Sequence, residues 1–340
     1  MANRIFFSIA GSIALAIDHV KIGTPRMLEY VNAESVKVKA EQYIRIGNAI
    51  LVIDEDVTLT WADLDTGSEE NSKDYFVYAC LPEAGNKPVF KISKNATCPA
   101  GYNPDNSRKI GGFHNNPDGD ILQYSVWDLD FRPACPDPRG MVYDPKSNIW
   151  VDIYLASDDG NGGVKSEYGA TILDSMNWFD FVDRGKKVGK RLLRYDEFMS
   201  IAEGTPEEVN IAGSSDPVTT GGHTATNGAR IKSNIGVEDA AGVMWQWGLG
   251  NTYRSDGTDW GWYNLPGSKG SMYRQGSYGC VIPLFGGPWG YGSFCGSRCV
   301  NLNNYPWNLN SNIGARFACD LIDQTVKIKV LAAVTKKSGP

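Results

Sequence analysis

Few residues in this chain have types and spacing that could do chemistry. Its three histidines, His19, His114 and His223, are scattered, and no Ser/His/Asp or paired-carboxylate arrangement stands out by spacing. His223 lies in a Gly-Thr loop, which is more typical of a surface residue than of a base. His114 lies in an expected strand and is interpreted as a satisfied structural histidine. We therefore predict no catalytic residues and no enzymatic activity.

The cysteines offer a second kind of chemistry. There are seven of them, and this odd number argues against a complete disulfide framework. Cys295 and Cys299 are spaced as C-x-x-x-C, which could indicate a metal site, but no histidine follows nearby. Small buried thiols are therefore favoured. The set is Cys80, Cys98, Cys135, Cys280, Cys295, Cys299 and Cys319.

Length and charge bound the class of protein. A chain of 340 residues exceeds one average domain, and about 150 residues per domain suggests two. The net charge of -6 argues against a phosphate-binding surface, which needs clustered Lys and Arg. The one basic run, residues 186–194, is typical of a solvated face. We expect no nucleic-acid partner.

One apolar segment near the start could be a targeting element. Residues 4–17 carry one basic residue and then an apolar stretch, which resembles a secretion signal but is too short to span a bilayer. No clear small-residue cleavage site precedes Asp18, so a buried amino-terminal strand or helix is favoured. No other segment could cross a membrane, and we expect no membrane insertion.

The elements that must position any site follow from the apolar patterns. Short alternating or apolar runs over residues 43–89 predict an all-β amino-terminal module, and the polar stretch 94–107 predicts a linker or long loop. Strands holding Trp127, Tyr143 and Trp150 should come next.

Two helices are expected after these strands. Apolar residues recur at helical spacing over residues 175–184 and 192–203, and Gly185 and Gly204 stand where the helices should end. Residues 213–234, rich in Ser, Thr and Gly, predict a long surface loop. No long periodic element follows this loop.

Four segments in sequence order resemble the C-type-lectin-like fold, in the version shared with formylglycine-generating enzymes. The first corresponds to a helix, a Gly-Lys-Arg-Leu turn and a second helix, and the second to a signature that ends in Trp-Glu-Trp. The third corresponds to an Arg-Gly-Gly-Ser-Trp turn, and the fourth to a closing Asn-x-Gly-Phe-Arg. The matching stretches are residues 178–204, 234–248, 273–279 and 310–319, and Gly236, Asp239, Gly242, Trp245 and Trp247 stand at signature positions. Four ordered matches are a specific signal.

This resemblance implies an α+β fold and divides the chain. It places a C-type-lectin-like domain over residues 108–323, with a variable ligand-binding region at about 273–320. Residues 1–100 would form a mainly-β module for oligomerisation or attachment. The tail, residues 324–340, begins with an alternating strand and ends in a basic, frayed terminus.

The oxidase chemistry of the formylglycine-generating enzymes looks lost. That chemistry needs two cysteines a few residues apart, whose soft thiolates hold copper. Tyr291 occupies the place where the first is expected, and Cys295 stands near the second. We expect no cofactor, although a structural Ca²⁺ near oxygen-rich loops such as residues 255–259 is an open alternative.

A closer resemblance covers more of the chain. Residues 109–114, 119–133, 140–157 and 286–320 resemble variable proteins of diversity-generating retroelements, the family that includes the phage major tropism determinant. In this family a reverse transcriptase copies a template with errors at adenines. Asparagine codons thereby become many other codons without creating stops, while the lectin-like scaffold stays unchanged.

The sequence carries the imprint that such copying implies. Six of the twelve residues from Asn301 to Asn312 are Asn. Other positions carry residues reachable from an asparagine codon by changes at its two adenines. The predicted variable, ligand-binding residues are Ser277, Tyr278, Pro288, Gly290, Tyr291, Phe294, Asn301, Asn303, Asn304, Asn308 and Asn310. The alternative is an asparagine-rich loop that hydrogen-bonds its own backbone.

A surface that accepts many side chains cannot also be the core. We therefore expect the variable residues to point outward, and Trp289, Trp307, Arg316 and Phe317 to point inward, with Arg316 bonded to backbone carbonyls. Exposed Tyr and Phe give contact area at low entropy cost, and Asn, Ser and Gly adapt hydrogen bonds, as in antibody paratopes.

The resemblance implies a binder of a host-cell surface receptor, protein or glycan, at a phage or prophage tail-fibre tip. Its partners would be tail-fibre proteins, and it would form a homotrimer. It would be located in the virion or, if it is not phage-encoded, at the cell surface or in the medium. A calcium-dependent lectin is the first rival. The usual Glu-Pro-Asn, Gln-Pro-Asp and Trp-Asn-Asp motifs of such lectins are absent. A copper-dependent oxidase is the second rival.

Overall fold

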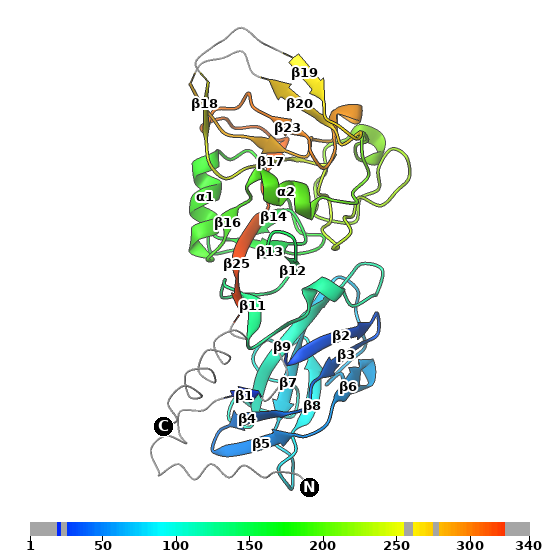
Figure 1. Cartoon of the computed structure of the whole chain (residues 1–340), viewed down its shortest axis with the longest axis vertical. Helices are drawn as coiled ribbons and strands as arrows, with labels where there is room; N and C mark the ends of the chain where they lie inside the picture. Colours follow the sequence, from blue (N-terminus) through cyan, green and yellow to red (C-terminus); the bar gives the residue numbers. More distant parts are fainter. Residues whose placement is uncertain (1–18, 22–25, 255–260, 275–278, 324–340) are drawn as a thin grey trace, which may run out of the picture.

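The computed structural model describes residues 19–21, 26–254, 261–274 and 279–323. These residues form two bodies along the long axis, the lower from the amino-terminal third and the upper from the rest (Figure 1). Strands predominate, and the described ranges hold only two α-helices. The amino-terminal segment 4–17 and the tail 324–340, each with its own prediction, lie outside the described residues.

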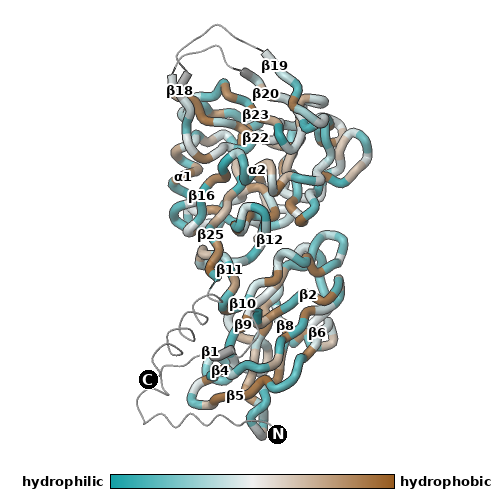
Figure 2. Tube along the Cα trace, viewed as in Figure 1, coloured by the Kyte–Doolittle hydropathy of each residue, from teal (hydrophilic) through white to brown (hydrophobic). Residues whose placement is uncertain are grey.

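Three antiparallel sheets make up the lower body. Leu51 and Ile53 of β5 are buried in a shared apolar interior, whereas Ile50 between Ala49 and Leu51 is 55% exposed. The trace of β5 is coloured as hydrophobic (Figure 2). The first sheet holds β1 (His19–Lys21), β4 (Gln42–Ile46) and β5 (Ala49–Ile53), and the second holds β2 (Leu28–Asn32), β3 (Ser35–Val38) and β6 (Val57–Thr60). The third, in the order β10-β9-β7-β8, holds β7 (Lys73–Cys80), β8 (Val89–Ser93), β9 (Ser107–Asn115) and β10 (Trp127–Asp128).

Strand β9 belongs to this lower body. The sequence analysis began the second domain at residue 108, but β9 pairs with β7 from Lys73↔Asn115 to Cys80↔Ser107. Such a long ladder satisfies the backbone hydrogen-bonding groups of both strands, and the apolar interior continues to Val126. The loop over residues 94–107 therefore joins two strands of one sheet.

The upper body has two larger sheets and two strand pairs. One sheet, in the order β11-β25-β13-β12, holds β11 (Phe131–Pro133), β12 (Met141–Asp144), β13 (Ile149–Asp152) and β25 (Phe317–Asp323), and β16 (Arg191–Leu192) also pairs with β25. The other holds, in order, β19 (Gly261–Asn264), β20 (Ser271–Arg274), β23 (Val300–Asn301), β22 (Leu284–Phe285), β17 (Trp245–Trp247) and β24 (Ile313–Gly314). The pairs are β14 (Ala156–Asp158) with β15 (Val164–Ser166), and β18 (Thr252–Arg254) with β21 (Gly279–Val281).

Both predicted helices are present, α1 (Trp178–Lys187) and α2 (Tyr195–Ile201). The expected stop of α1 at Gly185 was wrong, because this glycine lies within the helix. A Cβ there would come within 2.4 Å of the Phe317 ring, so close packing requires the glycine. Gly204, at φ +91°, follows α2 as predicted. Within the described ranges no helix has the length and apolar character needed to cross a membrane.

Polar and apolar contacts join the two bodies. His114 Nδ1 lies 3.1 Å from Asp74 Oδ1, and His114 Nε2 lies 2.9 Å from the Tyr154 hydroxyl. The backbone N–H of Gly140 donates to the same carboxylate of Asp74 at 2.9 Å. His114 is buried and bonded on both ring nitrogens, which confirms its structural role. An apolar cluster that includes Phe76, Trp127, Trp150 and Cys319 continues across the junction.

Candidate ligand-binding surface

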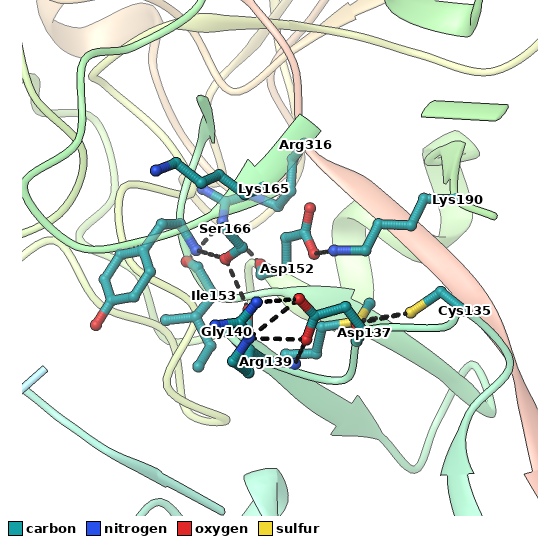
Figure 3. Close-up of polar contacts among 12 residues, drawn as sticks. Cys135, Asp137, Arg139, Gly140, Asp152, Ile153, Lys165, Ser166, Lys190 and Arg316 are labelled. Carbon is teal, nitrogen blue, oxygen red and sulfur yellow. Dashed lines mark hydrogen bonds and ion pairs between the residues drawn. The ribbon is translucent and has the colours of Figure 1, made fainter. Parts of the chain in front are cut away.

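A buried guanidinium organises the scaffold below the predicted surface. Arg316 is fully buried between β24 and β25, and its Nε donates to Gln246 Oε1 at 3.1 Å. Its Nη1 and Nη2 donate to the carbonyls of Asp152, Ile153, Glu238 and Asp239 at 2.9, 2.6, 2.6 and 3.3 Å. Figure 3 labels Arg316 together with Asp152 and Ile153. Burial lowers the pKa of Arg316 to about 10 against the opposing charges of nearby carboxylates, so it is charged at neutral pH. The predicted pairing with carbonyls is confirmed.

The other residues expected to point inward divide into two groups. Phe317 is fully buried and Trp289 is half-buried against the core. Trp307 is 61% exposed, so its inward orientation was wrong. Its ring stacks on Tyr305 with centroids 5.0 Å apart and an angle of 4°, which shields one ring face without a place in the core.

The predicted variable residues differ in exposure. Gly290, Tyr291 and Asn310 are exposed, and Phe294, Asn301, Asn303, Asn304 and Asn308 are half-buried. Pro288 is buried, contrary to expectation, because it forms a bridge with Val243 and its carbonyl accepts from the Tyr291 N–H and the Cys295 thiol. Ser277 and Tyr278 lie outside the described residues.

Aromatic rings surround two of the predicted variable residues. Phe294, in the short 3-10 helix Gly292–Phe294, stacks on Trp262 of β19 with ring centroids 4.4 Å apart and an angle of 16°. Tyr291 meets the edges of Trp262 and Trp245 at 5.8 and 5.6 Å. Trp262 also lies 5.1 Å from Tyr273. Trp262 was not among the residues predicted from the sequence, although the aromatic run 262–263 in a glycine-rich stretch was a signal for it.

The asparagines of the closing segment bond partly to one another. Asn301 Oδ1 accepts from the backbone N–H of Asn303 at 2.8 Å and from Asn304 Nδ2 at 3.2 Å. Asn308 Nδ2 donates to Asn304 Oδ1 at 3.2 Å. The self-bonded loop considered as the alternative therefore describes part of these contacts. Each of these side chains nevertheless keeps some exposed surface.

The signature residue Asp239 is a buried structural carboxylate. It lies in the left-handed region at φ +56°, and its Oδ2 accepts from the Gly221 N–H at 2.7 Å and lies 2.9 Å from His223 Nδ1. Burial lowers the pKa of His223, but the hydrogen bond and charge of Asp239 outweigh it and leave that pKa raised. His223 is thus a half-buried partner of the scaffold, not the free surface residue expected.

The C-x-x-x-C pair does not offer ready thiolates. Cys295 and Cys299 are free and fully buried, as small buried thiols should be. Burial raises the pKa of Cys295 to about 12 and raises that of Cys299 as well. Over the described ranges, no three His, Cys, Asp or Glu side chains gather into a metal-binding group. Residues 255–259, considered for calcium, lie outside those ranges.

The comparisons with known proteins agree on one family. The profile of a domain described as the Mtd second domain matches residues 26–128. A tail fiber receptor-binding protein of Bordetella phage BPP-1 is 29% identical over 320 residues, covering 84% of this chain and 80% of the relative. This chain is a relative of the phage major tropism determinants.

Solved structures of this family support the relation over both bodies. The P3c variant of the major tropism determinant superposes with a TM-score of 0.72 at 27% identity, covering 89% of this chain and 86% of that one. The U1 variant gives 0.71 at 28% identity, covering 88% and 84%. The mostly-β architecture with few helices is therefore that of the tropism determinants, which have a C-type-lectin-like fold.

Proposed function

We propose that this chain is the receptor-binding protein of a phage tail fibre, and that it attaches the virion to its host. The relation to a tail fiber receptor-binding protein over most of both chains carries this proposal. The relatives named here are binders, and we assign no enzymatic activity to this chain. Its partners would be a host-cell surface receptor and the proteins of the fibre.

The proposed binding face centres on Trp262, Tyr291 and Phe294 and extends to the closing asparagines. Register supports this continuity, because Tyr273, which lies against Trp262, pairs with Asn301. The backbone N–H of Trp245, whose ring meets Tyr291, donates to the Asn312 carbonyl at 3.0 Å. Large rings beside adaptable amides suit recognition of a varied receptor.

The finer assignments form part of the same proposal. The upper body would be a lectin-like domain of the formylglycine-generating-enzyme type, since α1, α2, the Trp-x-Trp strand β17 and Arg316 occur in that family's order. The lower body would be a module for oligomerisation or attachment, in a homotrimer. A reverse-transcriptase gene and a near-identical repeat beside the coding sequence would mark the retroelement.

Binding of the purified full-length protein to host cells tests the proposed face. Tyr291→Ala and Asn310→Ala remove exposed side chains from it, and the first should weaken binding by at least about tenfold. Tyr43→Ala is the matched control, because Tyr43 is an aromatic of β4 with 40% exposure in the lower body.

Three outcomes would count against the proposal. Saturable host binding could be absent, or Tyr43→Ala could reduce it while the two upper-body variants do not. Loss of binding on adding a calcium chelator would instead favour a calcium-dependent lectin. We expect the chelator to leave binding unchanged.

A further inference from the structure

Two cysteines far apart in the sequence lie in the buried cluster at the junction of the two bodies. Strands β11 and β25 pair antiparallel through Phe131↔Asp323 and Pro133↔Leu321, and the Ala134 N–H donates to the Asp320 carbonyl at 2.9 Å. Continuing this register beyond the end of the ladder, into the bend that begins at Ala134, brings Cys135 opposite Cys319, and both belong to the same buried cluster. Because residues 134 and 320 share the hydrogen bond, the cysteines occupy the neighbouring non-hydrogen-bonded position.

This position has the separation that a disulfide needs. Cα atoms of a non-hydrogen-bonded antiparallel pair lie about 4.5 Å apart, within the disulfide range of about 4.4–6.8 Å. Both cysteines are free, and each is the largest influence on the pKa of the other, raising that of Cys135 and lowering that of Cys319, as expected of two neighbouring thiols. The Cys135 thiol donates to the Asp137 carbonyl at 3.1 Å, so the bond to Cys319 requires only a rotation of this side chain. Bond formation therefore needs little movement of the backbone.

The surroundings favour reaction at Cys319. The hydrogen bond from Cys135 lowers the pKa of the Cys319 thiol, against desolvation, and the positive charge of Lys190 acts in the same direction. Lys190 is itself buried and paired with Asp152, its Nζ lying 2.6 Å from Asp152 Oδ1 (Figure 3). A lowered pKa makes Cys319 the more readily deprotonated of the two cysteines, and the thiolate is the nucleophile of thiol-disulfide exchange.

We propose that Cys135 and Cys319 are a disulfide-forming pair, which closes by exchange with a low-molecular-weight disulfide. The Cys319 thiolate attacks one sulfur of that disulfide, forms a mixed disulfide and releases one small thiolate, which takes up the proton that Cys319 lost. The Cys135 thiol then gives up its proton and attacks the Cys319 sulfur, and a second small thiol leaves. Two protein thiols are oxidised to one disulfide while one small disulfide is reduced to two small thiols.

Access for the small disulfide comes from the edge of the sheet. Cys135 and Cys319 are 1% and 3% exposed, but Ala134, Pro136 and Asp137 beside Cys135 are exposed. Strand β11 has three residues and pairs only with β25 within its sheet, so a local opening of this edge uncovers both sulfurs. The closed bond would hold this edge to β25, the strand that follows Arg316.

The test uses the purified full-length protein, first reduced and then exposed to glutathione disulfide. We expect a mass loss of about 2 Da, two fewer of the seven thiols open to alkylation after denaturation, and a cross-linked peptide containing Cys135 and Cys319. The midpoint of thermal unfolding should rise by about 5–10 °C, because the bond closes a long loop. Cys135→Ser and Cys319→Ser should abolish both changes, and Cys280→Ser, which removes a half-buried thiol elsewhere, should keep them.

Other results would overturn the inference without touching the proposed function, which depends on cell binding alone. They are seven reactive thiols after oxidation of the wild-type protein, a stable glutathione adduct, or a cross-link joining other cysteines such as Cys80 and Cys98. Since the mass and peptide measurements use the wild-type chain, they hold even if a serine variant fails to fold.

Discussion

At the scale of single residues, the scaffold depends on a few buried polar groups that each serve several backbone segments. Arg316 is the clearest case, because its guanidinium donates to carbonyls of two segments far apart in the sequence, residues 152–153 and 238–239, and to the side chain of Gln246 in β17. The planar guanidinium of an arginine has five N–H donors and can satisfy several buried carbonyls at once, whereas the ammonium group of a lysine cannot.

Arg316→Lys should therefore destabilise the protein by about 3 kcal/mol or more, since it keeps the charge and leaves buried carbonyls without donors. Urea unfolding of the purified variant measures the loss. Arg298→Lys, at an exposed arginine, is the control and should change stability by less than about 0.5 kcal/mol. Equal stability of the two variants would mean that the carbonyl contacts of Arg316 contribute little.

His223 should make stability depend on pH near neutrality. Its folded pKa is raised above the ordinary value, so its contribution is fully present below an unfolded pKa of about 6.5 and is lost as pH rises through the folded pKa. The unfolding temperature should fall as the pH rises above about 6.5, and by less in His223→Gln. Parallel curves for the two proteins would contradict this.

At the scale of elements, the turn before the predicted variable residues requires glycine at position 287 and has space for a side chain at position 290. Gly287 has φ +84°, and a Cβ there would come within 2.6 Å of the Cys295 sulfur. Gly290 is exposed, and a Cβ there would meet nothing within 4 Å. The turn thus has one position whose backbone requires glycine and, three residues later, one position with room for a side chain.

Gly287→Ala should cost about 1–3 kcal/mol, from backbone strain and from contact with Cys295. Gly290→Ala and Gly290→Tyr should stay within about 0.5 kcal/mol of the parent, as expected of a diversified position. Denaturant midpoints compare the three variants. A Gly290→Tyr variant as unstable as Gly287→Ala would show that position 290 is part of the packed frame.

At the scale of the whole molecule, binding strength should come from repeated copies. A face that accepts many side chains is not optimised for any one receptor, so each site should bind weakly. Linked sites raise apparent affinity by about 10²–10⁴, because later binding events become intramolecular.

Light scattering on the full-length protein should give a trimer, and host binding should weaken as dilution dissociates it. Host binding is measured at protein concentrations above and below the one at which the trimer dissociates, for the wild-type protein, Tyr43→Ala and Tyr291→Ala. Weaker binding of all three on dilution reports the effect of the number of linked sites, and weaker binding of Tyr291→Ala alone reports the contact made by that side chain. A full-length monomer that binds host cells as tightly as any multimer would contradict this account.

The sequence by itself determined the parts whose signals are local. Helical spacing located α1 and α2, the glycine after α2 stands where a left-handed residue is required, and the Trp-x-Trp and Asn-x-Gly motifs located the strands around Arg316. These features depend on neighbours within a few residues or on a whole motif, so one chain is enough to identify them.

The tertiary structure decided what depends on distant partners. Only strand pairing placed residues 107–115 with β7, and only packing left Trp307 exposed on Tyr305 while it buried Pro288. The register of β11 on β25 likewise brought Cys135 opposite Cys319. Spacing along the chain carries no information about such contacts, because a shift of one residue in register turns every side chain to the other face of the sheet.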